Sequence, residues 1–191
     1  MSLPIQHHRP RRAEDLQPLA GDLTLRRGRV HEFCGPSRLM LAARIMAGTQ
    51  GPVIWIRPGW LPERLNAAGL QPLADPARLI LVQTDRDENL LWATEEALRS
   101  GAAPLVVAEL SSPPALTPIR RLHLAAEAGA EAARRDAALA PPAPSRTLLW
   151  SDEDRWCLAR LRARLAPPAT WLLSATPRGE VTLIPNEVAG A

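Results

Sequence analysis

Short apolar runs alternate, over the first two thirds of the chain, with longer segments whose apolar residues recur every three or four positions. The apolar runs predict strands at residues 53–56, 79–83 and 104–110, and Val30 and Phe33 supply the strand character of a further predicted strand at residues 29–34. The segments between and after them predict helices at residues 38–47, 60–68, 85–100 and 117–128. This alternation is typical of βαβ units. We therefore predict an α/β fold with a mainly parallel sheet that helices cover on both faces.

Glycines and capping residues indicate where these helices end and begin. Gly48, Gly69 and Gly101 each follow a predicted helix and are expected to stop it. Asp85 and Glu88 have the spacing of a capping box, which predicts the start of the third helix.

The two ends of the chain have different compositions from its centre. Residues 1–24 mix proline, arginine and polar groups and predict a mobile arm, so that residues 25–188 form a single domain. Within that domain, residues 129–145 are rich in alanine, arginine and proline and predict a loop or linker.

The last third of the chain predicts further strands. Residues 146–150 predict one strand, and residues 170–175 with 181–184 predict a C-terminal antiparallel hairpin. Residues 155–165 fit two interpretations, because their apolar positions match a helical face while residues 156–163 also alternate as in a strand.

Composition excludes several classes of protein. Cys34 and Cys157 lie far apart and the four histidines form no ligand pattern with them, so neither a metal site nor a disulfide framework is expected. No apolar run is long enough to span a bilayer and no signal-peptide core follows the basic N-terminus, which predicts a cytoplasmic protein without membrane contact. The net charge of +3 permits attraction to nucleic acid, but the arginines are scattered, so direct DNA binding stays open.

The chain contains no lysine; all 23 basic side chains are arginine. The segment Gly35-Pro36-Ser37-Arg38 follows a predicted strand, where a phosphate-binding loop of the form G-x-x-x-x-G-K-[ST] would begin. The second glycine, the lysine and the hydroxyl of that motif are replaced by Met40, Leu41 and Ala42. Arginine is a poor substitute for the lysine because its charge is spread over a wide planar fork. We therefore expect no catalytic residue, no cofactor and a binding role in place of an enzymatic one.

Six tryptophans and one phenylalanine make up all the aromatic side chains, so most of the tryptophans are expected in the core. We predict this for Trp55 and Trp92. Trp60 lies on a connection rich in proline and glycine, which makes it a candidate partner-binding residue, since tryptophan is enriched at interface hot spots. Three arginines on one side of the alternating segment are further candidates, although a solvated charged face also explains them: Arg160, Arg162 and Arg164.

Three segments, taken in order, resemble bacterial RecA recombinases. Residues 28–37 resemble the strand and the start of the P-loop, and residues 79–83 with 95–102 resemble the strand and helix before the Walker B strand. Residues 165–168 are similar to a strand end in the same core. The resemblance touches most of residues 28–184 and implies a RecA-like core.

Within that superfamily, residues 90–102, 120–128 and 156–171 resemble the ImuA family of accessory proteins from bacterial mutagenesis cassettes. The resemblance implies a non-catalytic protein in SOS-induced, error-prone translesion DNA synthesis. Its implied partners are a Y-family-like polymerase homologue, an error-prone replicative-type polymerase and RecA. It also implies that residues 155–163 form a strand, and we adopt that prediction.

The RecA pattern places two further positions. Glu109 takes the place of the magnesium-organising Walker B carboxylate, while the glutamate that activates water has no counterpart in Arg57-Pro58-Gly59-Trp60. Two other functions remain open at this stage. One is a cell-division inhibitor resembling SulA, which binds the tubulin-like division protein. The other is a weak ATPase with a non-standard loop.

Overall fold

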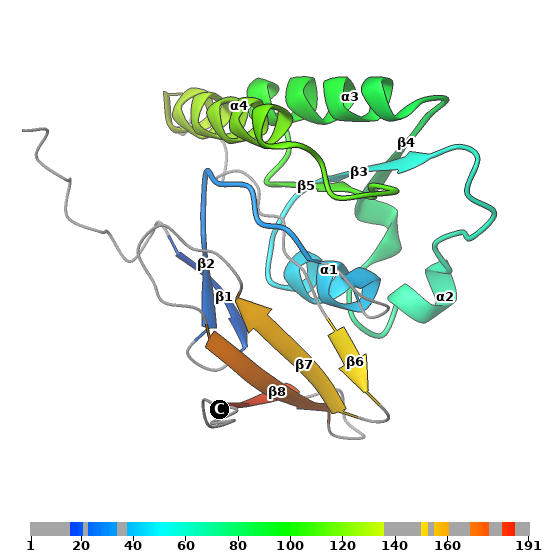
Figure 1. The fold of residues 1–191 in the computed structure, drawn as a ribbon, viewed down its shortest axis with the longest axis vertical. Helices are drawn as coiled ribbons and strands as arrows, with labels where there is room; N and C mark the ends of the chain where they lie inside the picture. The colour runs from blue at the N-terminus through cyan, green and yellow to red at the C-terminus, as the bar shows by residue number, and fades with distance from the viewer. Residues whose placement is uncertain are drawn as a thin grey trace, which may run out of the picture.

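The computed structural model describes residues 16–20, 23–33, 38–135, 150–152, 155–160, 169–175 and 181–185. At its centre lies a parallel sheet in the order β4 (Leu79–Thr84), β3 (Val53–Pro58), β5 (Leu105–Ala108). Figure 1 shows α3 (Asp87–Ser100) and α4 (Leu116–Arg135) along one face of this sheet, with α1 (Arg38–Ala47) and the short α2 (Ala67–Leu70) on the other side. A 3₁₀ turn, Pro76–Arg78, precedes β4. The predicted α/β fold with a parallel sheet between helices is confirmed.

Strand β3 is buried on both faces and joins two hydrophobic clusters. Because side chains alternate along a strand, Val53 and Trp55 face α1, whereas Ile54 and Ile56 face α3 and α4. The α1 cluster also contains Met46, and the opposite cluster contains Leu90 and Leu122, all of them fully or almost fully buried. This double burial explains why the sequence of β3 is a continuous apolar run with no alternation.

Helices α3 and α4 approach each other most closely at two glycines. A Cβ atom added to Gly129 would lie 1.9 Å from the carbonyl oxygen of Leu98, so a side chain cannot be accommodated there. Gly101 ends α3 in the left-handed conformation, with φ of 64°, and faces the backbone of Gly129. An ion pair between Glu95 of α3 and Arg121 of α4, at 2.5 Å, joins the same two helices.

Two antiparallel sheets complete the described chain. β1 (Leu16–Ala20) pairs with β2 (Leu23–Arg26). The second sheet has the order β6 (Trp150–Asp152), β7 (Arg155–Arg160), β8 (Ala169–Ala175), β9 (Val181–Pro185). The predicted hairpin is the β8–β9 pair, and the strand implied by the family resemblance is β7, so both predictions are confirmed.

The predicted mobile arm is wrong for the part that the structure describes. Residues 16–20 and 23–24 belong to β1 and β2, and Leu19 and Leu25 are buried in the α1 cluster. Residues 1–15 lie outside the described residues. A single hairpin is too short to give a strong periodic signal in the sequence. The cluster that buries it is formed mostly by later parts of the chain, including α1 and β3.

Two predicted elements near the sheet are wrong because side chains from elsewhere bind their backbone. Residues 29–33 form no strand; the amide of Val30 donates to Nδ1 of His123 on α4. Residues 61–66 form no helix, and the carbonyls of Leu61 and Glu63 accept hydrogen bonds from the guanidinium of Arg57. Of the predicted helix at 60–68, only its last two residues are helical, in α2.

The boundaries of α3 and α4 differ from prediction in two places. Helix α4 continues to Arg135, so the predicted loop at 129–145 is wrong for its first seven residues, while 136–145 lie outside the described residues. The capping box is also wrong. Arg86 occupies the N-cap without a side-chain cap, and Asp85 instead accepts a hydrogen bond from Asn89 at 2.6 Å.

Candidate functional site

The carboxyl ends of the three parallel strands define the candidate site, because α/β proteins bind ligands at this edge of the sheet. Arg57 and Pro58 end β3, Thr84 ends β4, and Glu109 follows β5 directly. Of the predicted loop residues, Gly35, Pro36 and Ser37 lie outside the described residues. Arg38 is the exposed first residue of α1.

The carboxylate at the Walker B-like position is bound within the protein. Nε1 of Trp55 donates a hydrogen bond of 2.7 Å to Oε1 of Glu109, and the amide of Glu109 donates to the carbonyl of Ile56. Trp55 is fully buried, as predicted, and a buried indole N–H needs an acceptor. Glu109 supplies that acceptor, which ties one of its oxygens to a structural role.

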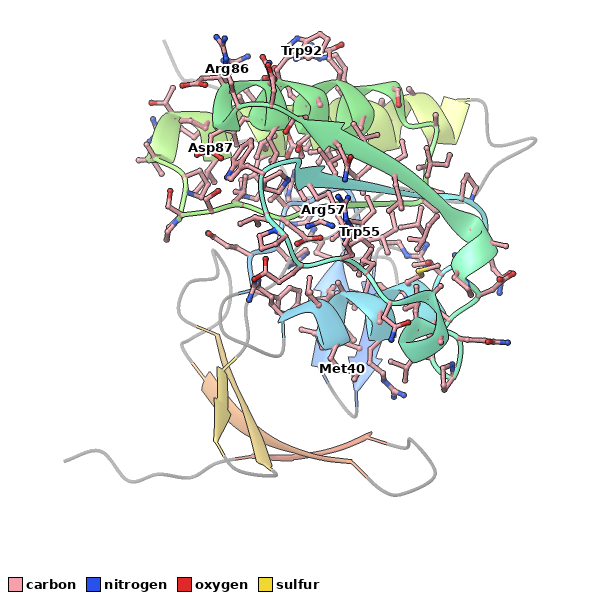
Figure 2. All side chains as sticks on the ribbon, turned by 90° about the vertical axis from the view of Figure 1, so that its right-hand side faces the viewer. Met40, Trp55, Arg57, Arg86, Asp87 and Trp92 are labelled. Atoms are coloured by element: carbon pink, nitrogen blue, oxygen red, sulfur yellow. The ribbon has the colours of Figure 1, made fainter. Side chains whose placement is uncertain are left out.

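Arg57 is a buried arginine at the same edge of the sheet, and the sequence did not single it out. Its Nη2 atom donates to the carbonyls of Leu61 and Glu63, which fixes the connection after β3 against the sheet. Its Nε atom is buried and has no hydrogen-bond partner among the described residues. Figure 2 shows Arg57 and Trp55 together between the sheet and α1. The signal in the sequence was a charged residue directly after a fully apolar run.

Helix α1 carries the residues at the P-loop positions of the lysine and the hydroxyl. Leu41 and Ala42 are both buried in the α1 cluster, whereas Met40, at the second glycine position, is partly exposed. Residues in the core cannot extend toward a phosphate in front of the sheet. The site therefore has apolar packing where a nucleotide-binding protein places its charge and its hydroxyl.

Trp60 lies on the connection that Arg57 anchors, and 46% of its surface is exposed. The prediction of an exposed Trp60 is confirmed. The structure does not test the three arginine candidates. Arg160 ends β7 and its side chain is outside the described part, while Arg162 and Arg164 lie outside the described residues.

Trp92 was predicted in the core, and this prediction is wrong, since 62% of the side chain is exposed. The buried face of α3 contains Leu90, Thr94 and Leu98, and Trp92 lies on the other side of the helix. Figure 2 shows it extending from α3 away from the sheet. Helical spacing could have placed it correctly, because it falls two residues after Leu90; the scarcity of other aromatic residues outweighed that signal.

A pair of histidines lies where the segment after β2 contacts α4. Burial lowers the pKa of His31 to about 4, although its hydrogen bond to the carbonyl of Arg26 opposes the shift. Burial, with the charge of Arg29, also lowers the pKa of His123. Arg29 itself forms an ion pair with Glu127 of α4. The Val30–His123 hydrogen bond and the Arg29–Glu127 ion pair attach residues 29–30 to α4, and the lowered pKa values of both histidines favour their neutral forms.

Within the part of the chain that the structure describes, no three histidine, cysteine or carboxylate side chains are grouped so as to hold a metal ion. The described helices include none that is both long and apolar enough to cross a membrane.

No family model matches the chain. No curated protein matches it in sequence. Among solved structures, the chain is similar to the crystal structure of SulA from Pseudomonas aeruginosa, with 24% sequence identity and a TM-score of 0.43. The match covers 59% of this chain and 87% of that chain. A similarity of this extent assigns no function. The geometry defines a class, an α/β protein with a central parallel sheet, in which Glu109 and Arg57 at the carboxyl ends of the strands form hydrogen bonds within the protein.

Proposed function

We propose that this protein is a non-catalytic, RecA-like accessory protein of SOS-induced translesion DNA synthesis, similar to the ImuA family and acting in the cytoplasm. It binds a Y-family-like polymerase homologue and an error-prone replicative-type polymerase, and it contacts RecA. Its function depends on protein surfaces and not on nucleotide chemistry.

This proposal rests mainly on one observation: the polar side chains at the carboxyl ends of the three parallel strands form hydrogen bonds within the protein itself. Glu109 accepts from Trp55, Arg57 donates to the carbonyls of its own loop, and Leu41 and Ala42 are in the core. A P-loop enzyme needs a lysine for the phosphates and a hydroxyl with a free carboxylate for magnesium. The same positions here stabilise the fold, which supports a binding protein.

The exposed connection after β3 supports partner binding through Trp60. The buried guanidinium of Arg57 fixes the loop that carries Trp60, so this aromatic ring is presented from a restrained connection. A restrained aromatic side chain loses little conformational entropy on binding and is the type of residue that dominates interfaces. We therefore assign Trp60 to the polymerase-cassette interface.

The test is a binding measurement with the purified cassette proteins and RecA, paired with damage-induced mutagenesis in cells. Trp60→Ala should weaken binding to a cassette protein by about 30-fold, as expected of a hot spot worth roughly 2 kcal/mol. Mutagenesis after DNA damage should fall with it. Trp92→Ala is the matched control, since it removes a tryptophan that is even more exposed, but on α3.

One result would contradict the assignment of Trp60, and two others would contradict the proposed function. Unchanged binding and mutagenesis in Trp60→Ala would place the interface elsewhere. ATP hydrolysis that is lost in Glu109→Ala would indicate an enzyme. Cell filamentation on overexpression, with unaltered mutagenesis, would support the division-inhibitor alternative.

A further inference from the structure

Strand β4 forms one edge of the parallel sheet in the described chain. It pairs with β3 along its whole length, from Val53 opposite Leu79 to Pro58 opposite Thr84, without a bulge. No described strand pairs with its other side. Every second backbone N–H and C=O group along β4 therefore points away from the sheet.

The first four side chains of β4 are apolar, and each face of the strand has one of them open to solvent. Ile80 lies on the α3 face and is 50% exposed, and Leu81 lies on the α1 face and is 57% exposed. No residue from Leu79 to Thr84 is charged. Exposed edges of natural sheets are commonly protected by lysine, proline, a bulge or a covering element. The regular, uncharged β4 has none of the first three.

The nearest basic side chain is directed away from the edge. The guanidinium of Arg78 donates to the carbonyls of Gly51 and Met46, at 2.7 and 2.9 Å, and to Oγ1 of Thr49 at 3.0 Å. These three bonds hold it toward the end of α1 and the turn before β3. An arginine that would protect a free edge is thus engaged in the fold, which leaves β4 accessible to another strand.

We propose that β4 pairs with β4 of a second copy of this chain, antiparallel and about a twofold axis, with Leu81 opposite Leu81. In an antiparallel pair, directly opposed residues lie on the same face of the sheet. This register therefore places Ile80 opposite Val82 and Leu79 opposite Gln83. No like charges face each other, and both exposed apolar residues are covered. Identical surfaces that complement themselves are the requirement of a twofold dimer.

The pairing is independent of the proposed function, because it uses a different part of the sheet from Trp60. A single strand pair covers less surface than the roughly 1,200 Å² of a stable interface. We therefore expect a reversible dimer with a dissociation constant in the micromolar range.

Sedimentation velocity over a dilution series tests the association. The full-length protein should be dimeric at about 100 μM and dissociate on dilution. Leu81→Lys should raise the dissociation constant by more than about 10-fold, because two lysines would oppose each other at the axis. Leu124→Lys is the control, since Leu124 is 64% exposed on α4 and lies on another surface. A monomer at all concentrations, or equal weakening by the control, would overturn the proposal.

Cysteine cross-linking tests the register separately. In a Cys34→Ser, Cys157→Ser background, only a residue at the twofold axis meets its own copy. Leu81→Cys should oxidise to a covalent dimer, whereas Gln83→Cys, on the same face two residues along, should remain monomeric. Cross-linking through Gln83→Cys with none through Leu81→Cys would show that the proposed pairing is wrong. Circular dichroism of each variant separates loss of pairing from loss of fold.

Discussion

His31, in the segment after β2, is buried with a lowered pKa, which makes the fold sensitive to acid. Burial places its pKa near 4 in the folded chain, against 6.5 for an exposed histidine. Between these two values the unfolded chain binds a proton that the folded chain does not. Stability is therefore lost as pH falls from about 6.5 toward 4.

We predict that the free energy of unfolding falls by about 3 kcal/mol from this histidine alone between pH 7 and pH 4. Urea denaturation at a series of pH values measures it. His31→Gln should lose that part of the slope, because glutamine does not titrate, while the carboxylates act equally in both proteins. Parallel pH profiles for the two proteins would contradict the assignment.

Individual residues were predictable where local sequence decides their environment. Trp55 falls inside a fully apolar run and is buried, and Trp60 falls beside proline and glycine and is exposed. The bond between Trp55 and Glu109 was not predictable, since it joins residues 54 positions apart through the register of β3 and β5. The burial of Arg57 was not predicted for a different reason: it depends on the conformation of the loop that follows β3, whose carbonyls at Leu61 and Glu63 accept from its guanidinium.

The close approach of α3 and α4 depends on the absence of a side chain at Gly129. An alanine there would place its Cβ against the carbonyl oxygen of Leu98, and two backbones cannot yield as a flexible side chain can. We predict that Gly129→Ala lowers the free energy of unfolding by about 3 kcal/mol. Denaturant unfolding followed by circular dichroism measures the change.

Gly69→Ala is the matched control for this substitution. Gly69 also lies in a helix, α2, but an added Cβ would meet only the side chain of Asn66, at 3.7 Å or more. Its stability should change by less than about 1 kcal/mol. If both alanine variants behaved alike, helix propensity and not helix contact would explain the effect of Gly129→Ala.

Whole elements were predicted well where the sequence repeats one signal over many residues. α1 and α3 have sustained apolar faces and end at or next to Gly48 and Gly101, and β3 is uninterrupted. Two of the failures are short segments whose backbone is bound by a side chain: residues 61–66 by nearby Arg57, and residues 29–33 by a distant histidine. The amide of Val30 is satisfied by a residue 93 positions away, and no local pattern contains that information.

At the scale of the whole molecule, β3 belongs to two cores at once. Its alternate residues enter the α1 cluster and the α3–α4 cluster, so neither cluster can lose its packing without disturbing the shared strand. We predict that Met46→Ala and Leu90→Ala each cost about 2–5 kcal/mol. In each variant both clusters should still unfold together, in a single transition with a lower midpoint.

Urea unfolding followed by tryptophan fluorescence and by circular dichroism checks this cooperativity. The two probes should give the same midpoint for each variant. Two separate transitions in either variant would mean that the clusters unfold independently and that β3 does not couple them.

The hydrogen bond between Trp55 and Glu109 also bears on how the chain could change in evolution. A lysine at Leu41 or a hydroxyl at Ala42 would enter an apolar core, and the carboxylate needed beside them is already held by the indole. Nucleotide chemistry of the P-loop type at these positions would therefore require coordinated substitutions at several buried positions. Each would be destabilising before the others were present. Selection for stability alone would then oppose each single step toward such a site.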